Sequence, residues 1–208
     1  MFTNIVSWLA VLMILVSSTG MVLSRDWRWT LGLCAGQYLA AFWLVSLHWP
    51  VGLASVKLVT GWMSIATLGL TRLNQLEDVD LLESFWPHQR WFHFFLAGII
   101  ILLTAAASPV IESILPGLGL PVVVGSVLLI GMGLIHLGIT SSTLRVILGL
   151  LTFLCGFEIL YAAIEGSILV AGLLAMVNLG LALIGSYLLA AGDMESVDTG
   201  FDDLESGP

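Results

Sequence analysis

Long apolar runs follow one another along this chain, and each is close to the roughly 20 residues that a helix needs to cross a bilayer. The seven runs lie at 4–23, 30–48, 51–71, 92–108, 119–138, 144–163 and 167–190. They are continuous, whereas membrane-spanning strands alternate apolar and polar residues over segments of about ten residues. The pattern therefore predicts an all-α, polytopic membrane protein with about seven transmembrane helices.

The composition agrees with this fold class. Of the 208 residues, 59% are hydrophobic and 10% are charged, against about 25% charged residues in soluble domains. Six Lys and Arg stand against fourteen Asp and Glu, so the basic surface of a nucleic-acid binder is missing. Cys34 and Cys155 lie inside apolar runs, which argues against a disulfide framework or a metal cluster. We expect no nucleic-acid partner, no metal and no cofactor.

The few basic residues predict the orientation. If the N-terminus is outside, every Lys or Arg of the connections falls on the cytoplasmic side, as the positive-inside rule requires. These residues are Arg25, Arg28, Arg72, Arg90 and Arg145. The external connections would then hold only acidic charges, Glu112 and Glu165. We therefore expect an N-out, C-in protein, with Trp27, Trp29, Trp49, Trp86 and Trp91 at the membrane interfaces.

Two acidic segments would be cytoplasmic, the connection at 73–89 and the tail at 191–208. Either could dock a basic partner, and either could simply be a solvated acidic stretch. The tail has too little apolar content to fold alone.

Lys57 lies about six residues into the third run, on one helical face with four hydroxyl residues spaced three and four apart. This seam consists of Lys57, Thr60, Ser64, Thr67 and Thr71, and it should pack on protein or line water. Ionisable groups inside a membrane are costly and are functional candidates by default. The alternative is that Lys57 snorkels to the outer headgroups while the hydroxyls bond between helices.

Glu158 lies about fourteen residues into the sixth run, roughly 21 Å at 1.5 Å per residue, which is too deep for its carboxyl group to reach either surface. It is either a neutral hydrogen-bond donor between helices or part of a proton relay. Glu165, seven residues later on the same face, could continue a path to the external side.

Two further polar residues are path candidates. His136 lies near the inner end of the fifth run, and no second ligand stands at metal spacing from it; packing or an interfacial position is its other interpretation. Asn178 lies in the middle of a seam of small residues in the seventh run, formed with Ala171, Ala175, Ala182 and Gly185. Such a seam permits close helix packing, and the role of Asn178 stays open.

The last three runs resemble a known membrane module. The stretches Gly133-Leu134, Leu144-Arg145-Val146-Ile147-Leu148-Gly149-Leu150 and Glu158-Ile159-Leu160 are similar to the K-type membrane subunit of respiratory complex I and to the C subunit of Mrp-type Na⁺/H⁺ antiporters. Registering on Arg145 and Gly149 places Glu158 at the polar position of the antiporter family. The complex I carboxylate would fall one turn earlier, near Cys155, and its third-helix carboxylate corresponds to Asn178.

The whole chain resembles the E component of hydrogenase-4-type complexes, in which a membrane Lys follows a Gln-bearing helix. Gln37-Tyr38-Leu39 followed by Val56-Lys57-Leu58 has that order. The resemblance implies four N-terminal helices with an acidic cytoplasmic loop (1–118), the three-helix module (119–190) and an acidic tail (191–208). It also implies a location in the inner (cytoplasmic) membrane.

We therefore expect a non-catalytic membrane subunit of a complex-I-like, hydrogenase-like or Mrp-like assembly, with larger antiporter-like subunits as partners and redox chemistry in those partners. Its polar residues would contribute to proton or cation translocation. The alternative is a structural or assembly subunit of another energy-transducing complex. A stand-alone transporter is disfavoured because Pro109, Pro116 and Pro121 are expected to bracket a connection rather than break a span.

Overall fold

The computed structural model describes the backbone of residues 2–24, 26–74, 87–140 and 142–205, and the side chains of nearly all of these up to residue 191. Within them the chain forms seven helices and no strand. The helices are α1 (Phe2–Leu23), α2 (Trp27–Ser46), α3 (Val51–Asn74), α4 (Pro87–Ile114), α5 (Leu120–Ile139), α6 (Thr143–Ile164) and α7 (Ile168–Glu205). The predicted all-α class is confirmed.

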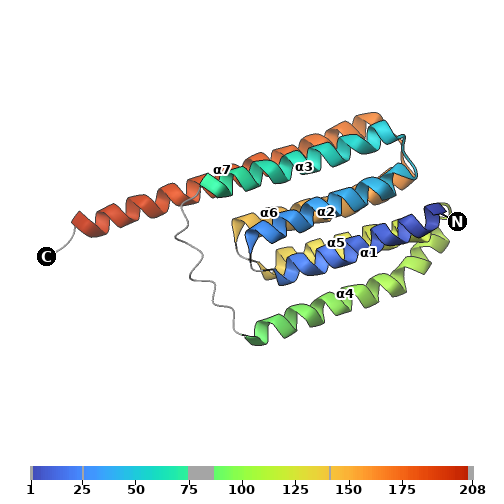
Figure 1. Cartoon of the computed structure of the whole chain (residues 1–208), viewed down its shortest axis with the longest axis horizontal. Helices are drawn as coiled ribbons and strands as arrows, with labels where there is room; N and C mark the ends of the chain where they lie inside the picture. Colours follow the sequence, from blue (N-terminus) through green and yellow to red (C-terminus); the bar gives the residue numbers. More distant parts are fainter. Residues whose placement is uncertain (1, 25, 75–86, 141, 206–208) are drawn as a thin grey trace.

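The helices form two layers that pack face to face. Helices α1, α2 and α3 lie side by side in one layer, and α5, α6 and α7 form the other. Each helix of the first layer packs on its counterpart in the second, α1 on α5, α2 on α6 and α3 on α7, and the paired helices run in the same direction (Figure 1). Helix α4 lies at one edge, against α5 and α1. The α2–α6 pair is consequently central, and the site described below is built beside it.

Most helix boundaries lie near the predicted ones, and two differ. Helix α4 runs to Ile114 rather than to 108, so that Pro109 lies inside it, and the expectation that this proline lies in the connection is wrong. The apolar run simply continues past it. Pro121, by contrast, stands in the first turn of α5, where its missing N–H costs nothing. Helix α7 continues past the predicted end at 190, into the acidic tail, as far as Glu205.

Six of the seven helices are long and apolar enough to cross a membrane, which supports a multi-pass membrane protein. They are α1, α3, α4, α5, α6 and the part of α7 that ends at Ala191. Helix α2 is the exception, although its 20 residues match the length of α5. Its apolar sequence is interrupted by Gln37 in its middle, and Arg28 lies in its first turn.

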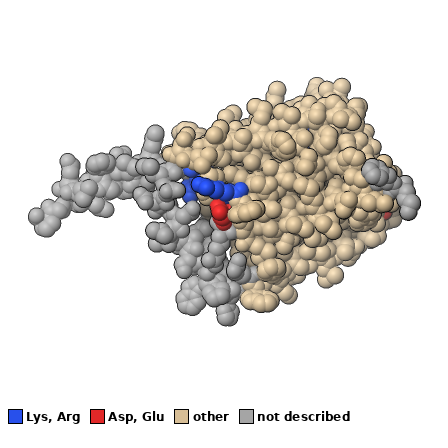
Figure 2. Space-filling model, in the orientation of Figure 1, with Lys and Arg blue, Asp and Glu red and all other residues tan. Residues whose placement is uncertain are grey.

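The alternating helix directions bring the connections together at two ends of the bundle. The arginine end holds the connections 24–26 and 140–142, and with them Arg28, Arg72 and Arg145. The Trp49 end holds the connections 47–50, 115–119 and 165–167. In Figure 2 the basic side chains visible on this face gather beside the arginine end. Arg25, the acidic residues of 75–86, Trp86 and the side chains of Arg90 and of the tail lie outside the described residues.

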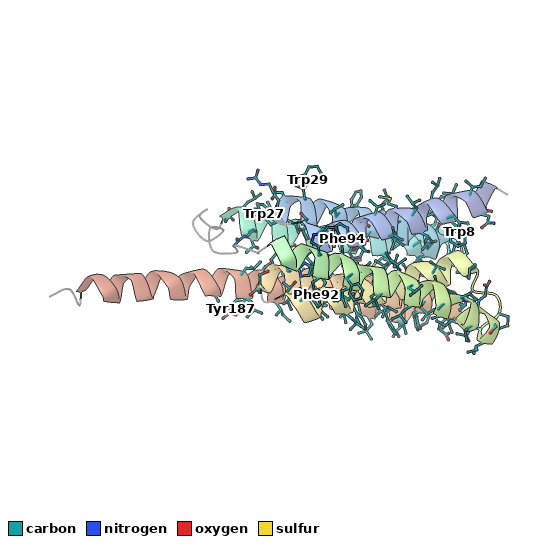
Figure 3. The ribbon with its side chains drawn as sticks, turned by 90° about the horizontal axis from the view of Figure 1, so that it is seen from below. Trp8, Trp27, Trp29, Phe92, Phe94 and Tyr187 are labelled. Carbon is teal, nitrogen blue, oxygen red and sulfur yellow. The ribbon has the colours of Figure 1, made fainter. Side chains whose placement is uncertain are left out.

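Large aromatic side chains point outward near the arginine end (Figure 3). Trp29 is 70% exposed, and Phe92 and Tyr187 are also exposed. Tryptophan and tyrosine favour the level of the lipid headgroups. Their position therefore matches an interfacial belt at this end of the bundle, as the sequence predicts for Trp27 and Trp29.

Candidate functional site

The centre of the site is an ion pair between Lys57 of α3 and Glu158 of α6. The Lys57 ammonium donates to the Oε2 atom of Glu158, and the two side chains are only 7% and 6% exposed. Lys57 lies six residues after the start of α3 and Glu158 six residues before the end of α6, so both lie roughly 9 Å from the Trp49 end. Lys57 does not reach for the surface, so the snorkelling alternative is wrong for this structure.

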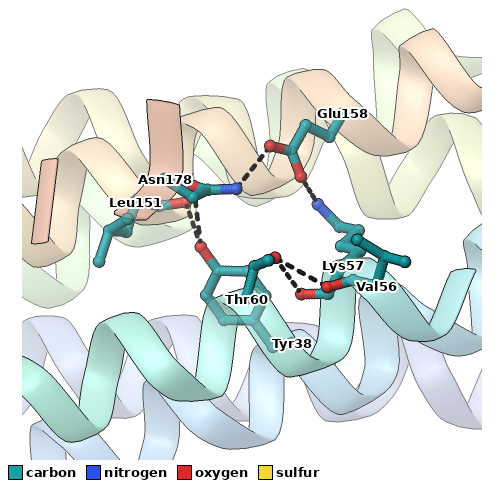
Figure 4. A network of polar contacts seen from close by, with 7 residues as sticks. All are labelled: Tyr38, Val56, Lys57, Thr60, Leu151, Glu158 and Asn178. Carbon is teal, nitrogen blue, oxygen red and sulfur yellow. Dashed lines mark hydrogen bonds and ion pairs between the residues drawn. The ribbon is translucent and has the colours of Figure 1, made fainter. Parts of the chain in front are cut away.

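Asn178 of α7 extends the pair into a network (Figure 4). Its Nδ2 atom donates to the Oε1 atom of Glu158 at 2.6 Å, so both carboxylate oxygens accept a hydrogen bond. The Tyr38 hydroxyl of α2 lies 3.3 Å from the Asn178 Oδ1 atom and 3.5 Å from the Leu151 carbonyl oxygen. Because a hydroxyl has one hydrogen, it donates to one of these acceptors at a time.

Tyr38 also supports the ammonium directly. The Lys57 Nζ atom lies 5.6 Å from the centre of the Tyr38 ring, within the range of a cation–π interaction. This approach depends on Gly61 of α3, because a side-chain carbon there would collide with the Tyr38 ring. A glycine one turn along from Lys57 thus lets α2 and α3 come close enough for the ring to face the charge.

The hydroxyl seam of α3 is covered mainly by the same chain. Ser64 is fully buried and donates to the Asn178 carbonyl oxygen of α7 at 3.2 Å. Thr60, Thr67 and Thr71 donate to carbonyl oxygens of their own helix. The seam residues Lys57, Thr60 and Ser64 are therefore buried within the chain itself, whereas Thr67 and Thr71 are only partly buried.

A second group of hydrogen bonds connects α1, α2 and α6 through Gln37. Gln37, next to Tyr38, donates from Nε2 to the Ser18 hydroxyl of α1 at 2.7 Å. Its Oε1 atom accepts a hydrogen bond from the Thr152 hydroxyl of α6 at 3.1 Å. Gln37 is 1% exposed, so these bonds satisfy an amide that water cannot reach. Two consecutive residues of α2 thus hold polar networks on both sides of the helix.

The five candidates from the sequence fall into two groups. Lys57, Glu158 and Asn178 come together in one network. Glu165 ends α6 at the Trp49 end, where it is exposed and its backbone oxygen accepts a hydrogen bond from the Trp49 indole at 3.0 Å. His136 is buried on α5 near the arginine end. Its Nε2 atom has no hydrogen-bond partner among the described residues, so it lies apart from the network.

Tyr38 is the residue of the network that the sequence pattern does not predict. A tyrosine in an apolar helix is ordinary, and only the adjacent Gln37 distinguishes it. The ion pair had a clearer signal: Lys57 and Glu158 are opposite charges at equal depth from the same end of the bundle. Two such charges inside a membrane favour each other as partners.

Comparisons of the chain with protein-family models, with curated proteins and with solved structures find no match.

Proposed function

We propose that the chain is an integral membrane subunit of a complex-I-like, hydrogenase-like or Mrp-antiporter-like assembly and contributes polar residues to proton or cation translocation. The observation that supports this is the buried Lys57–Glu158 ion pair, bonded to Asn178 at membrane depth. In this proposal the partners are larger antiporter-like subunits, which carry the redox or transport chemistry, and the location is the inner (cytoplasmic) membrane.

The pair couples proton uptake to proton release. As an ion pair it has no net charge, and transfer of a proton from Lys57 to Glu158 gives a neutral pair that also has none. A proton that reaches Glu158 from outside leaves the Lys57 ammonium unpaired, and an unpaired buried charge is costly. Lys57 is then driven to release its own proton. The two residues therefore pass a proton on without a net charge staying in the membrane.

Asn178 and Tyr38 position the carboxylate for this exchange. The amide of Asn178 fixes one carboxylate oxygen, and the Tyr38 hydroxyl fixes the amide in turn. If Glu158 becomes protonated and donates, the Asn178 side chain can rotate to offer its oxygen, and the Tyr38 hydroxyl can then accept from its nitrogen. The network has partners for both protonation states.

The alternative, a structural or assembly subunit, is favoured because each charged group of the network has a partner within the chain. Both oxygens of Glu158 and the ammonium of Lys57 have partners, which is what packing alone requires. In that case the pair fixes the relative positions of α3, α6 and α7 and carries no protons.

Neutral variants of the pair separate the two functions in the assembled complex. Glu158→Gln alone leaves Lys57 without its counter-ion, so the matched double variant Lys57→Gln with Glu158→Gln is needed to keep the site neutral. We expect the double variant to assemble and to lose proton or Na⁺ uptake into reconstituted vesicles. Glu165→Gln, at an exposed position of the same face, should reduce uptake less. Tyr187→Phe, at a side chain that is 72% exposed, is the control and should keep its uptake rate. Uptake by the double variant at the unmodified rate would favour the structural subunit.

A further inference from the structure

A small cavity lies against the ion pair, on the side that faces the Trp49 end. Its volume is about 20 Å³, which is enough for a water molecule. The polar part of its wall comes from Lys57, Thr60, Glu158 and Asn178. The rest of the wall comes from α2, α3 and α7 and includes Trp49 in the connection between α2 and α3. The wall therefore reaches from the buried pair to the end of the bundle.

The polar residues of this wall have unused hydrogen-bonding capacity. Lys57 has three N–H donors, of which one goes to Glu158 and a second interacts with the Cys155 side chain, so that a third is left. Asn178 has a second N–H beside the one given to Glu158. The Thr60 hydroxyl donates to its own helix, which leaves its oxygen free to accept. A buried water needs two to four polar partners, and this wall supplies them.

The site is closed in the opposite direction. Toward the arginine end the helices that carry the network bury Leu68, Leu148 and Leu151, each fully enclosed. Leu151 lies seven residues before Glu158 on α6 and Leu68 lies eleven residues after Lys57 on α3. Apolar side chains packed without space exclude water. Among the described residues, the polar lining of the cavity leads from the pair toward the Trp49 end.

We propose that the cavity is a water-binding site that connects Lys57 and Glu158 to the Trp49 end of the membrane and to that end alone, with Trp49 as its cover. The Trp49 indole holds this cover in place through its hydrogen bond to the Glu165 backbone oxygen at 3.0 Å. The water site itself does not depend on the proposed function. Its use for proton exchange rests on that function, and the site then specifies the membrane face from which the pair exchanges protons.

Thiol labelling tests the cavity without measuring transport. Ala175 lines the cavity, whereas the adjacent Met176 is 72% exposed on the outer face of α7 at almost the same depth. In full-length protein in oriented vesicles, Ala175→Cys should react with a membrane-impermeant thiosulfonate added at the Trp49 end whenever the Trp49 side chain moves aside, because the covered cavity admits a water molecule and not the reagent. Met176→Cys, in lipid, should react more slowly by on the order of tenfold, because only a hydrated thiol forms the reactive thiolate. The unmodified chain, whose Cys34 and Cys155 are fully buried, gives the background.

The variant Trp49→Phe tests the cover, because it keeps an aromatic ring and removes the indole hydrogen bond. We expect it to accelerate labelling of Ala175→Cys and to leave Met176→Cys unchanged. Equal labelling from both faces would overturn the one-sided route. Labelling of Ala175→Cys no faster than of Met176→Cys would show a cavity filled by lipid or closed. Labelling tests the water site, and uptake by the Lys57–Glu158 variants tests the proposed function. A failure of one proposal can therefore be distinguished from a failure of the other.

Discussion

At the scale of single residues, we expect the free energy of unfolding to depend most on the Lys57–Glu158 ion pair, because both charges are buried. Removal of one partner from a buried ion pair costs about 3–5 kcal/mol because the other charge is left uncompensated. We therefore expect Lys57→Gln and Glu158→Gln each to lower the free energy of unfolding by about this amount. The double variant should lose clearly less than the sum. Unfolding in detergent, analysed as a double-mutant cycle, measures the coupling, and purely additive losses would contradict the ion pair.

The Tyr38 hydroxyl makes a smaller contribution that can be separated from its ring. Tyr38→Phe keeps the ring over Lys57 and removes the donor to Asn178, and we expect a loss of about 1 kcal/mol in unfolding free energy. Tyr38→Leu should lose more, because the cation–π contact goes as well. The control is Tyr187→Phe, at a side chain that is 72% exposed. Thermal unfolding that shifts as little for Tyr38→Phe as for this control would exclude a role for the hydroxyl.

The sequence indicates which polar residues are functional candidates, and it says much less about which of them are in contact in the folded protein. Lys57 and Glu158 stand out in the sequence because a charge in an apolar run is costly in a membrane, and Asn178 stands out as the polar residue in a seam of small residues. Tyr38 has a much smaller cost of membrane insertion, because its aromatic ring is largely apolar. His136 satisfies the same criterion as Glu158 and yet lies on a helix that does not contribute to the network. Depth and polarity alone do not tell neighbouring helices from distant ones.

At the scale of helices, close packing of α5 on α6 depends on glycine. A side-chain carbon at Gly156 would lie 2.7 Å from the Ser126 carbonyl oxygen, and one at Gly133 would lie 2.6 Å from the Phe153 backbone nitrogen. Both obstacles are backbone atoms, which cannot move aside as a flexible side chain can. The two helices therefore approach each other through glycines on both partners, as small-residue interfaces in membranes do.

Alanine at these positions should force α5 and α6 apart. We expect Gly156→Ala and Gly133→Ala each to destabilise the protein by about 1–3 kcal/mol, the usual cost of overpacking. Gly180→Ala is the matched control, because nothing lies within 4 Å of a side-chain carbon there. It should be neutral or slightly stabilising, since alanine favours the helix over glycine. A melting temperature lowered equally in all three variants would point to a general cost of alanine instead of to the contact between α5 and α6.

Apolar length predicts the helices well and predicts their ends less well. The runs at 144–163 and 119–138 agree closely with α6 and α5. Helix α4 continues through Pro109, where a proline pattern predicts a boundary. Helix α7 continues into the acidic tail, where the loss of apolar residues predicts an end. A proline removes one backbone hydrogen bond and an acidic residue removes none, so neither decides the boundary alone.

At the scale of the whole molecule, the order of packing was not accessible from the sequence. Short connections require consecutive helices to be antiparallel, and this gives the two ends of the bundle. They do not specify that α1, α2 and α3 pack on α5, α6 and α7 in matching order. That arrangement places Lys57 of α3 beside Glu158 of α6 and Asn178 of α7. The resemblance divides the sequence into four N-terminal helices and a three-helix module. The site combines the two parts, because Lys57 comes from the first and Glu158 and Asn178 come from the second.

The two ends of the bundle should lie on opposite faces of the membrane, with the Trp49 end outside. This requires α2 to cross as well, although it is not among the six candidate spans, because short connections join it to α1 and α3. Its Gln37 and Tyr38 face neighbouring helices, so a crossing does not expose them to lipid. We expect Ser24→Cys and Asn74→Cys, at the arginine end, to be labelled only from the cytoplasmic face, and His48→Cys and Gly166→Cys only from outside. The same pairs with the faces exchanged would reverse the orientation derived from the arginines. Labelling of Ser24→Cys and His48→Cys from one and the same face would show that α2 does not span, and the seven-span topology would be wrong.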